Sequence, residues 1–186
     1  MKNKLVISCH ADTGFKTHRL KVKKNGDYHG HLDNFIGVYA VMNSYFSGKL
    51  DRENIRIELT YGEETGMDGA KEVLKTLHKD DTVIVVDVTG VPTKKDFTIE
   101  KCSDKGLREF LDKALSGMSY ELYEDCPDPV ANADECDIYN KKVKRVCFLG
   151  IPCRGGDYNA GMVSASPRSV SAVSEALARI AKAFNR

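Results

Sequence analysis

The stretch TVIVVDV, at residues 82–88, decides the fold of this chain. Its continuous run of apolar, mostly β-branched side chains is typical of a strand that is buried on both faces. On either side of it, short β-branched runs alternate with longer segments that are apolar along one face. This alternation predicts an α/β fold with three α/β/α layers, a mostly parallel central sheet and a single domain over residues 1–186. Further strands are predicted at 4–8, 54–60, 98–101, 119–123 and 145–149, and helices at 34–46, 67–77, 105–115 and 169–184.

Charge and composition narrow the class of protein. The 28 basic and 27 acidic side chains give a formal net charge of +1, so the chain lacks the basic surplus that nucleic-acid binding needs. No apolar run approaches the ~20 residues that cross a bilayer, and the apolar stretch near Met1 is too short for a signal peptide. The six cysteines include no CxxC pair, which favours reduced thiols. We therefore expect a soluble, cytoplasmic protein that binds neither nucleic acid nor a membrane.

Polar residues gather where the predicted strands end. Residues 8–12 follow the first strand, 30–34 precede the first helix, 61–66 follow the next strand, and 87–90 end the central one. In an open parallel sheet, the carboxyl ends of the strands form the edge at which ligands bind. Four separate segments should therefore bring one group of side chains to that edge: His10, Asp12, Asp33, Glu63, Glu64 and Asp87.

Such a cluster of carboxylates needs positive charge. Without it, the carboxylates repel one another and some must stay protonated when buried. Imidazole and carboxylate ligands suit zinc, with manganese or cobalt as substitutes. These ligands are too many for one tetrahedral ion, so two divalent ions that share a bridging carboxylate fit them better. Because Glu63 and Glu64 are neighbours, their side chains should point in different directions, so that one binds metal while the other stays free as a base.

The order of these motifs resembles that of one known group of enzymes, the co-catalytic di-zinc aminopeptidases of peptidase clan MH. Two segments, CHADTGF at 9–15 and IPCR at 151–154, are most similar in sequence to the deblocking, or glutamyl, aminopeptidase branch. The likeness runs from Leu5 to about Asp157. The motifs that carry it are His-x-Asp at 10–12, Leu-Asp-Asn at 32–34, GEETGMDGA at 62–70 and Val-Asp-Val-Thr at 86–89.

The resemblance implies a role for each matching side chain. His10 and Asp87 would hold one ion, Glu64 would hold the other, and Asp33 would bridge the two. Asp12 would hydrogen-bond to the imidazole of His10 and fix its tautomer. The cofactor implied is therefore two divalent ions, zinc first, with manganese or cobalt able to replace it.

The same resemblance implies that Glu63 is the general base of a metal-dependent exopeptidase. It would take a proton from the metal-bridging water that attacks a peptide carbonyl, and it would return this proton to the leaving amine. Short peptides are the expected substrates. The sequence leaves an N-acyl amino acid or another amide open as the substrate, because the residues of a specificity pocket show no pattern.

The chain departs from the family pattern in two places. The family has a histidine ligand at the position of Asp157, but no histidine follows His78. Asp157 is an acceptable oxygen ligand, with a loop-capping aspartate as the rival interpretation. Only 20 residues separate Asp12 from Asp33, so the lid domain of that branch is missing, and the basic loop at 14–29 forms at most a small flap. These departures favour, as an alternative, a catalytically silent metal-binding protein with a regulatory or assembly role, and formation of a homo-oligomer is left open.

The residues of the cluster also have purely structural interpretations. Asp33 could cap the helix that follows it. Glu63 and Glu64 could form an ordinary solvated turn. Thr65, followed three residues later by Asp68, predicts a capping box at the start of the second helix in either case.

His31 and Arg154 are the candidate substrate-binding residues. His31 lies two residues before Asp33, and Arg154 either holds a substrate carboxylate or carbonyl or forms a structural ion pair. The segment at 119–139 has seven acidic residues and no basic one. It is interpreted either as a solvated loop or as an acidic rim that attracts a cationic group of the substrate.

Overall fold

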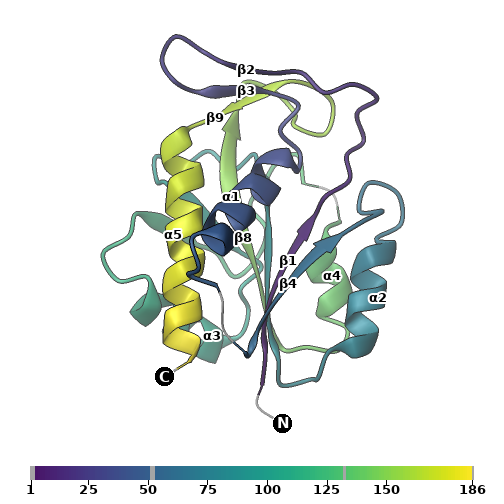
Figure 1. Cartoon of the computed structure of the whole chain (residues 1–186), viewed down its shortest axis with the longest axis vertical. Helices are drawn as coiled ribbons and strands as arrows, with labels where there is room; N and C mark the ends of the chain where they lie inside the picture. The colour runs from purple at the N-terminus through teal and green to yellow at the C-terminus, as the bar shows by residue number, and fades with distance from the viewer. Residues whose placement is uncertain (1–2, 51–52, 132, 186) are drawn as a thin grey trace.

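A mixed, mostly parallel β-sheet runs through the middle of the molecule, with helices on both of its faces (Figure 1). The structure is a computed structural model that describes residues 3–50, 53–131 and 133–185. The arrangement confirms the α/β fold class with α/β/α layers that the sequence predicts.

The centre of the sheet consists of four parallel strands. Strand β5 (Thr82–Thr89) is buried at every residue, as its apolar sequence predicts. It pairs with β1 (Leu5–His10) on one side and with β8 (Arg145–Arg154) on the other, and β1 pairs with β4 (Ile55–Thr60). Because these strands run in one direction, their carboxyl ends meet at one edge of the sheet.

Two further strands extend the sheet beyond β8. Strand β6 (Phe97–Glu100) is antiparallel to β8, and β7 (Tyr120–Leu122) is parallel to β6. In this register Thr98 lies opposite Gly150, which in turn lies opposite Asp87 of β5. Residues of β6 thus come close to the polar end of the central strand.

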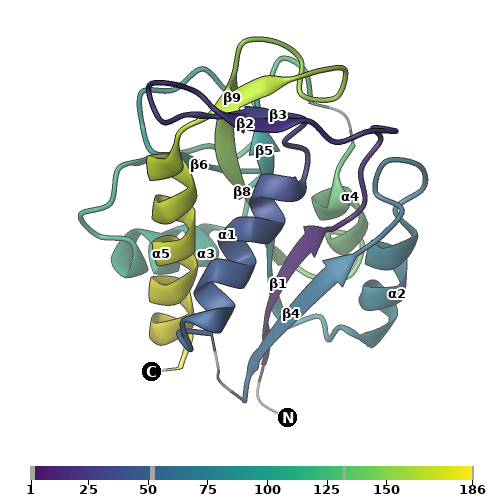
Figure 2. The same cartoon turned by 45° about the horizontal axis from the view of Figure 1, so that its top comes forward.

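Three short strands cross the carboxyl edge of the sheet, as Figure 2 shows. Strand β2 (Leu20–Val22) pairs with β3 (Tyr28–Gly30), β3 pairs with β9 (Val163–Ala165), and β9 pairs with the end of β8, all antiparallel. The loop at 14–29, expected to form a small flap, therefore contributes strands to the sheet. The sequence does not reveal them because β2 and β3 are each only three residues long, too short to show a period, and β2 is exposed throughout.

Helices cover both faces of the sheet (Figure 1). α1 (Phe35–Phe46), α3 (Lys105–Ala114) and α5 (Pro167–Phe184) lie on one face, and α2 (Asp68–Thr76) and α4 (Glu135–Tyr139) lie on the other. No helix among the described residues is both long and apolar enough to cross a membrane.

The pleat of the strands decides which side chains reach each face, since successive residues point to opposite sides. On β5, Ile84 packs in the core on the α1 side, whereas Val85 packs in the core on the α2 side. Asp87 lies two residues after Val85 on β5, so its side chain also points to the α2 side. On β1, Val6 packs on the α2 side, so His10 is directed to that side as well.

The predicted capping box at Thr65 and Asp68 is wrong. Helix α2 begins after Met67, which has a left-handed φ of 59° and makes no side-chain cap hydrogen bond, while the Thr65 hydroxyl donates to the carbonyl of Gly62. A capping box does occur at α4, which the sequence analysis missed. There the side chain of Asp134 caps the first turn, and that of Asp137 accepts from the Asp134 N–H.

Candidate metal centre

His10 ends strand β1, and its residue is only 1% exposed. Its Nε2 atom lies 3.1 Å from Oδ1 of Asp33 and 3.1 Å from Oδ2 of Asp87. Despite these short distances, neither ring nitrogen of His10 nor Oδ1 of Asp33 has a hydrogen-bond partner among the described residues. The atoms approach one another without the orientation of a hydrogen bond. Burial of polar atoms in this state is costly unless something between them satisfies them.

Asp33 reaches this point because the residue after it is firmly anchored. The Asn34 side chain donates from Nδ2 to the carbonyl of Val86 at 2.8 Å and to Sγ of Cys9 at 3.3 Å, which ties the start of α1 to β5 and β1. Its Oδ1 accepts from the N–H of Gly37, so Asn34 is the N-cap of α1. The interpretation of Asp33 as the helix cap is therefore wrong, and its carboxylate is free to face the imidazole.

Asp87 completes the buried group. Its Oδ1 accepts from the N–H of Val88 at 2.7 Å, so Oδ2 faces the imidazole. One ligand atom from each of His10, Asp33 and Asp87 lies within 4.8 Å of the other two. One imidazole and two carboxylates form a donor set that divalent transition-metal ions accept. These side chains therefore fit a divalent ion, which would satisfy the unpartnered atoms.

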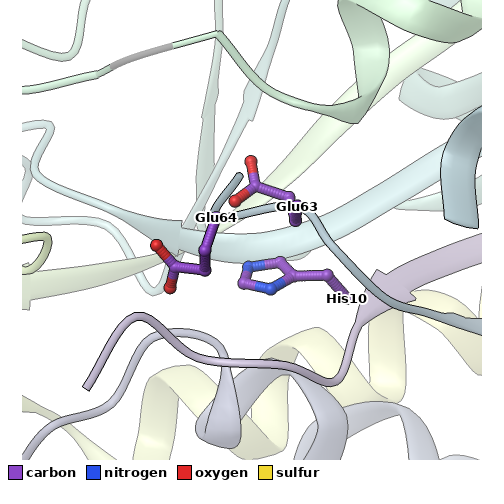
Figure 3. A group of neighbouring side chains, drawn as sticks. All are labelled: His10, Glu63 and Glu64. Atoms are coloured by element: carbon purple, nitrogen blue, oxygen red, sulfur yellow. The ribbon is translucent and has the colours of Figure 1, made fainter. Parts of the chain in front are cut away.

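Glu63 and Glu64 come from the tight turn between β4 and α2. The carbonyl of Gly62 accepts from the N–H of Gly66 at 2.8 Å, and Gly62 has a φ of +71°, which glycine adopts without strain. One ligand atom of each glutamate and one of His10 lie within 4.8 Å of one another. Figure 3 shows the two carboxylates diverging from adjacent positions on the turn. One of them can therefore join an ion at the imidazole while the other remains free.

Asp12 and Gly14, which follow β1, position the histidine and both glutamates. Oδ1 of Asp12 lies 3.5 Å from Nδ1 of His10 and accepts from the backbone N–H of Glu63 at 3.4 Å. The backbone of Gly14 lies against the side chain of Glu64; burial raises the pKa of this carboxyl group, and that backbone lowers it. A Cβ atom at Gly14 would lie only 2.9 Å from Oε2 of Glu64, so the close approach depends on glycine. The contact of Asp12 with the ring fits the orienting role expected for it.

The pKa values of the cluster indicate a lack of positive charge. Burial lowers the pKa of His10, but the charges of Asp87 and Asp33 outweigh this effect and raise it to about 12. Burial raises the pKa of Glu63 to about 8, and it also raises the pKa of Glu64 and of Asp87. A divalent cation would replace the proton on the imidazole and lower the pKa of each carboxyl group.

A second buried network supports the cluster from below. Glu135 of α4 accepts hydrogen bonds from the hydroxyl of Ser8 at 2.7 Å and from that of Thr60, and the Tyr139 hydroxyl lies 2.8 Å from the Ser8 oxygen. Thr60 lies opposite His10 in the β1–β4 pair. The network therefore joins α4 to the two strands at the level of the histidine.

A cavity of about 120 Å³ opens beside the cluster. Four acidic residues of the cluster line it, and Glu100, Asp128 and Tyr158 are among its other lining residues. The sequence analysis did not single out these three residues. Asp128 belongs to the acidic segment at 119–139. The interpretation of this segment as an acidic rim of the binding site is the only sequence feature that indicates a role for Asp128. Glu100 and Tyr158 carry no local sequence signal.

Most of the chain matches the model of a known protein family. The family model described as "Peptidase family M28" matches residues 1–146. The chain belongs to this family. Peptidases of family M28 are metal-dependent, in agreement with a centre that could hold a metal. No curated protein sequence is similar enough to the chain to count as a match.

Solved structures share the fold of this M28 protein at low sequence identity. A TET aminopeptidase from a marine sediment Thaumarchaeota archaeon is 14% identical, with a TM-score of 0.70 over 90% of this chain and 55% of that chain. The Pyrococcus horikoshii TET1 peptidase, also 14% identical, has a TM-score of 0.68 over 90% and 53%. A tripeptidase from Staphylococcus aureus, 12% identical, has a TM-score of 0.67 over 99% and 82%. The chain spans about half the length of the archaeal peptidases that it matches.

Asp157 of the M28 protein lies in the exposed turn after β8. Its Oδ1 accepts from the backbone N–H of Asn159 at 2.9 Å and from Nδ2 of the same residue at 3.1 Å, as a loop-capping aspartate does. Within the described residues, neither ligand group around His10 includes Asp157. Its role as a ligand remains a prediction.

The two candidate substrate-binding residues of the M28 protein have structural partners. Nη2 of Arg154 lies 2.8 Å from Oδ2 of Asp27, and the arginine side chain is 62% exposed. This contact is the ion pair that was the alternative interpretation. Nδ1 of His31 hydrogen-bonds to the carbonyl of Thr17, and its ring stacks on Phe15 at 4.1 Å. The contacts of Arg154 with Asp27 and of His31 with Thr17 and Phe15 hold the loop at 14–29 in place.

Proposed function

We propose that the protein is a metal-dependent exopeptidase that removes residues from the amino end of short peptides. The observation that carries this proposal is the convergence of the unpartnered His10 Nε2 with carboxylate oxygens of Asp33 and Asp87, beside Glu63 and an open cavity. Membership of peptidase family M28 supports it.

The residues that would hold the metal are those already described. His10, Asp33 and Asp87 would hold one ion, for which zinc is our first choice, with manganese or cobalt as substitutes. Glu64 would bind a second ion together with a bridging carboxylate of Asp33. When bound, the ions supply Lewis-acid activation of a peptide carbonyl and of the attacking water.

Glu63 would move the proton in this reaction. Its carboxylate diverges from that of Glu64, so it can accept a proton from the attacking water while Glu64 serves as a ligand. It would then transfer the proton to the leaving amine. Asp12, whose Oδ1 lies 3.5 Å from Nδ1 of His10, would keep the imidazole in one tautomer. The same oxygen accepts from the backbone N–H of Glu63 and would hold that turn in position.

The proposal also covers the domain organisation, the location and the assembly of the protein. We expect a single catalytic domain over residues 1–186 and a cytoplasmic location, which the free cysteines support. An N-acyl amino acid is the alternative substrate. Because the TET1 peptidase of Pyrococcus horikoshii assembles into a tetrahedron or an octahedral shell, a homo-oligomer of this chain is also proposed.

A second candidate function is a catalytically silent metal-binding protein with a regulatory or assembly role. The position of Asp157 favours it, because this residue is exposed and bonded to Asn159 instead of extending the ligand set. This candidate predicts one tightly held ion per chain and no hydrolysis.

The test combines metal analysis with a peptidase assay. The protein is stripped with a chelator, reloaded with zinc, manganese or cobalt, and incubated with short peptides that carry a free or an acetylated amino terminus. We expect cleavage of the free peptides and a loss of about 10²–10⁴-fold in turnover for Glu63→Gln at unchanged metal content. The control is Glu109→Gln, the same change at an exposed position on α3.

The outcomes separate the candidates. Cleavage of acetylated substrates only would replace the aminopeptidase by an amidohydrolase of N-acyl amino acids. A loaded protein that cleaves neither set would be the silent metal-binding protein. Full activity of Glu63→Gln would refute the role of Glu63.

A further inference from the structure

The cavity beside the metal centre ends at two acidic side chains, Glu100 and Asp128, that the proposed reaction does not use. We infer that this end of the cavity binds the cationic side chain of the first residue of the substrate, so that the enzyme prefers peptides that begin with lysine or arginine. The inference rests on the proposed function, because it places the first residue at the metal centre.

The charges around the cavity leave a deficit that a cation would fill. Of the acidic side chains that line it, those of the metal cluster would be neutralised by bound ions, and Asp134 pairs with Nζ of Lys101 at 2.9 Å. Glu100 and Asp128 have no basic partner among the described residues. Asp33, which is 5% exposed and has an unpartnered Oδ1, lines the same cavity as Glu100 and Asp128, so the acidic residues adjoin the candidate metal centre.

Glu100 is built into the sheet at the floor of this space. The residue is 1% exposed, and its Oε1 accepts from the hydroxyl of Thr98 at 2.6 Å, while its Oε2 receives only the weak contact of Cys126 Sγ at 3.7 Å. A Cβ atom at Gly150 would lie 2.9 Å from Oε1, so the glycine of β8 leaves the room that the carboxyl group occupies. The neighbouring donors are neutral and do not cancel a negative charge.

Asp128 is held by neutral donors as well. Its Oδ2 accepts from the N–H of Gly90 at 2.7 Å, from the hydroxyl of Tyr158 at 2.8 Å and from that of Thr89 at 3.2 Å. These bonds fix the position of the carboxylate. A carboxylate fixed in a cavity is a suitable partner for an ammonium or guanidinium group.

The distance between Glu100 and the metal cluster suits the side chain of the first substrate residue better than its terminal amine. Thr98, Gly150 and Asp87 lie side by side on β6, β8 and β5, so Glu100 is about one to two strand spacings from the cluster, roughly 5–10 Å. The terminal amine is two bonds from the reacting carbonyl carbon and must stay near the ions. The four-carbon stem of lysine can cross this distance.

The wall between the two ends suits such a stem. Val88, Cys126 and Phe148 line the cavity together with the acidic residues. Lysine and arginine bury their aliphatic stems on apolar surface while their charged ends reach polar partners. An apolar wall that leads to paired acids therefore matches these side chains.

The test compares lysine with norleucine, which has the same stem without the ammonium group. The ratio of kcat/KM for lysyl and norleucyl 7-amido-4-methylcoumarin is measured for the metal-loaded protein, and binding of free L-lysine and L-norleucine is measured by calorimetry. We expect lysine to be favoured over norleucine by at least ~10-fold in kcat/KM and in affinity. Its ammonium group can form a charge-assisted hydrogen bond with the carboxylates, whereas norleucine has no donor at this position. Glu100→Gln should remove most of this preference. Glu109→Gln, the same change at an exposed position on α3, should keep the ratio.

Each result decides between the two proposals. Equal or better use of norleucine, with hydrolysis present, would overturn the inference and leave the exopeptidase in place. Failure to hydrolyse either substrate, combined with selective binding of lysine that Glu100→Gln removes, would reject the exopeptidase and retain the cation site. Persistence of the preference in Glu100→Gln would also overturn the inference.

Discussion

Replacement of Asn34 by alanine should weaken both the fold and the metal centre, although Asn34 touches no expected ligand atom. The side chain makes three contacts that lock the start of α1 onto the sheet: with the Gly37 N–H, the Val86 carbonyl and Cys9 Sγ. Because Asp33 precedes Asn34 directly, its carboxylate reaches His10 only while this anchor holds.

The magnitude follows from these contacts. Loss of an N-cap to alanine costs about 1 kcal/mol. The β1–β5 pairing ends at Ser8 and Val85, and the Asn34 amide donates to the carbonyl of the next residue, Val86. A buried carbonyl left without its donor costs a further ~1–3 kcal/mol. We therefore expect the free energy of unfolding of the metal-free protein to fall by roughly 2–4 kcal/mol.

Urea denaturation of the chelated protein measures this loss, and calorimetric titration with zinc measures the effect on the centre. We expect the affinity for the ion to fall about 10–100-fold, as when a residue that orients a ligand is removed. Asn34→Ser keeps a capping oxygen and should lose about 1 kcal/mol less. The matched control is Asn43→Ala on the same helix, where only a 3.4 Å contact with Ser174 is lost and the change should stay below about 1 kcal/mol.

Unchanged zinc affinity in an Asn34→Ala protein that remains folded would refute the reasoning, because Asp33 would then hold its position without the anchor. Equal stability of the Asn34→Ala and Asn43→Ala proteins would refute the energetic part.

Three further outcomes test other parts of the structure. Metal binding should release at least one proton, because the pKa of His10 is raised to about 12 and that of Asp87 to about 7, so the Kd for zinc should fall at least about tenfold as the pH rises from 6 to 7; titrations in two buffers of different ionisation enthalpy would show no proton release if this is incorrect. Glu135→Ala should lower the free energy of unfolding by about 2–4 kcal/mol in urea denaturation, because the hydroxyls of Ser8 and Thr60 lose their buried acceptor; a loss below 1 kcal/mol would mean that water replaces the carboxylate. Asp157→Ala should leave the zinc content unchanged in metal analysis, because its carboxylate is exposed and bonded to a neighbouring side chain; a fall in zinc content would restore it as a ligand.

The chemistry-bearing cluster was predictable from the sequence because strand direction places it. His10, Glu63 and Asp87 each come at or just after the end of a strand, and parallel strands bring their ends to one edge. The structure indeed groups them. The direction of each side chain was less predictable, since the pleat and the turn at Gly62 decide which residues face the imidazole.

Other parts of the site depend on contacts between distant segments. Thr65 was expected to cap α2, but the bonds that close the turn on the Gly62 carbonyl place the helix start after Met67. Asp157 matches the position of a family ligand in the sequence, yet its turn is occupied by bonds to Asn159. Such competition between partners is settled only when the loops are packed.

The sequence by itself determined the central parallel strands and the long helices, but not β2, β3, β9 or α4. The central strands fix the edge at which the acidic residues and the histidine gather, because hydrophobic periodicity and chain direction are local properties. Only the tertiary structure decided which of these residues share a ligand position and that Asn34, not Asp33, caps α1. It also decided that Glu100 and Asp128, 28 residues apart, line one cavity with the cluster. The physical reason is that a cavity and a metal centre are defined by distances across the sheet, and these distances arise only when the strands are paired in register.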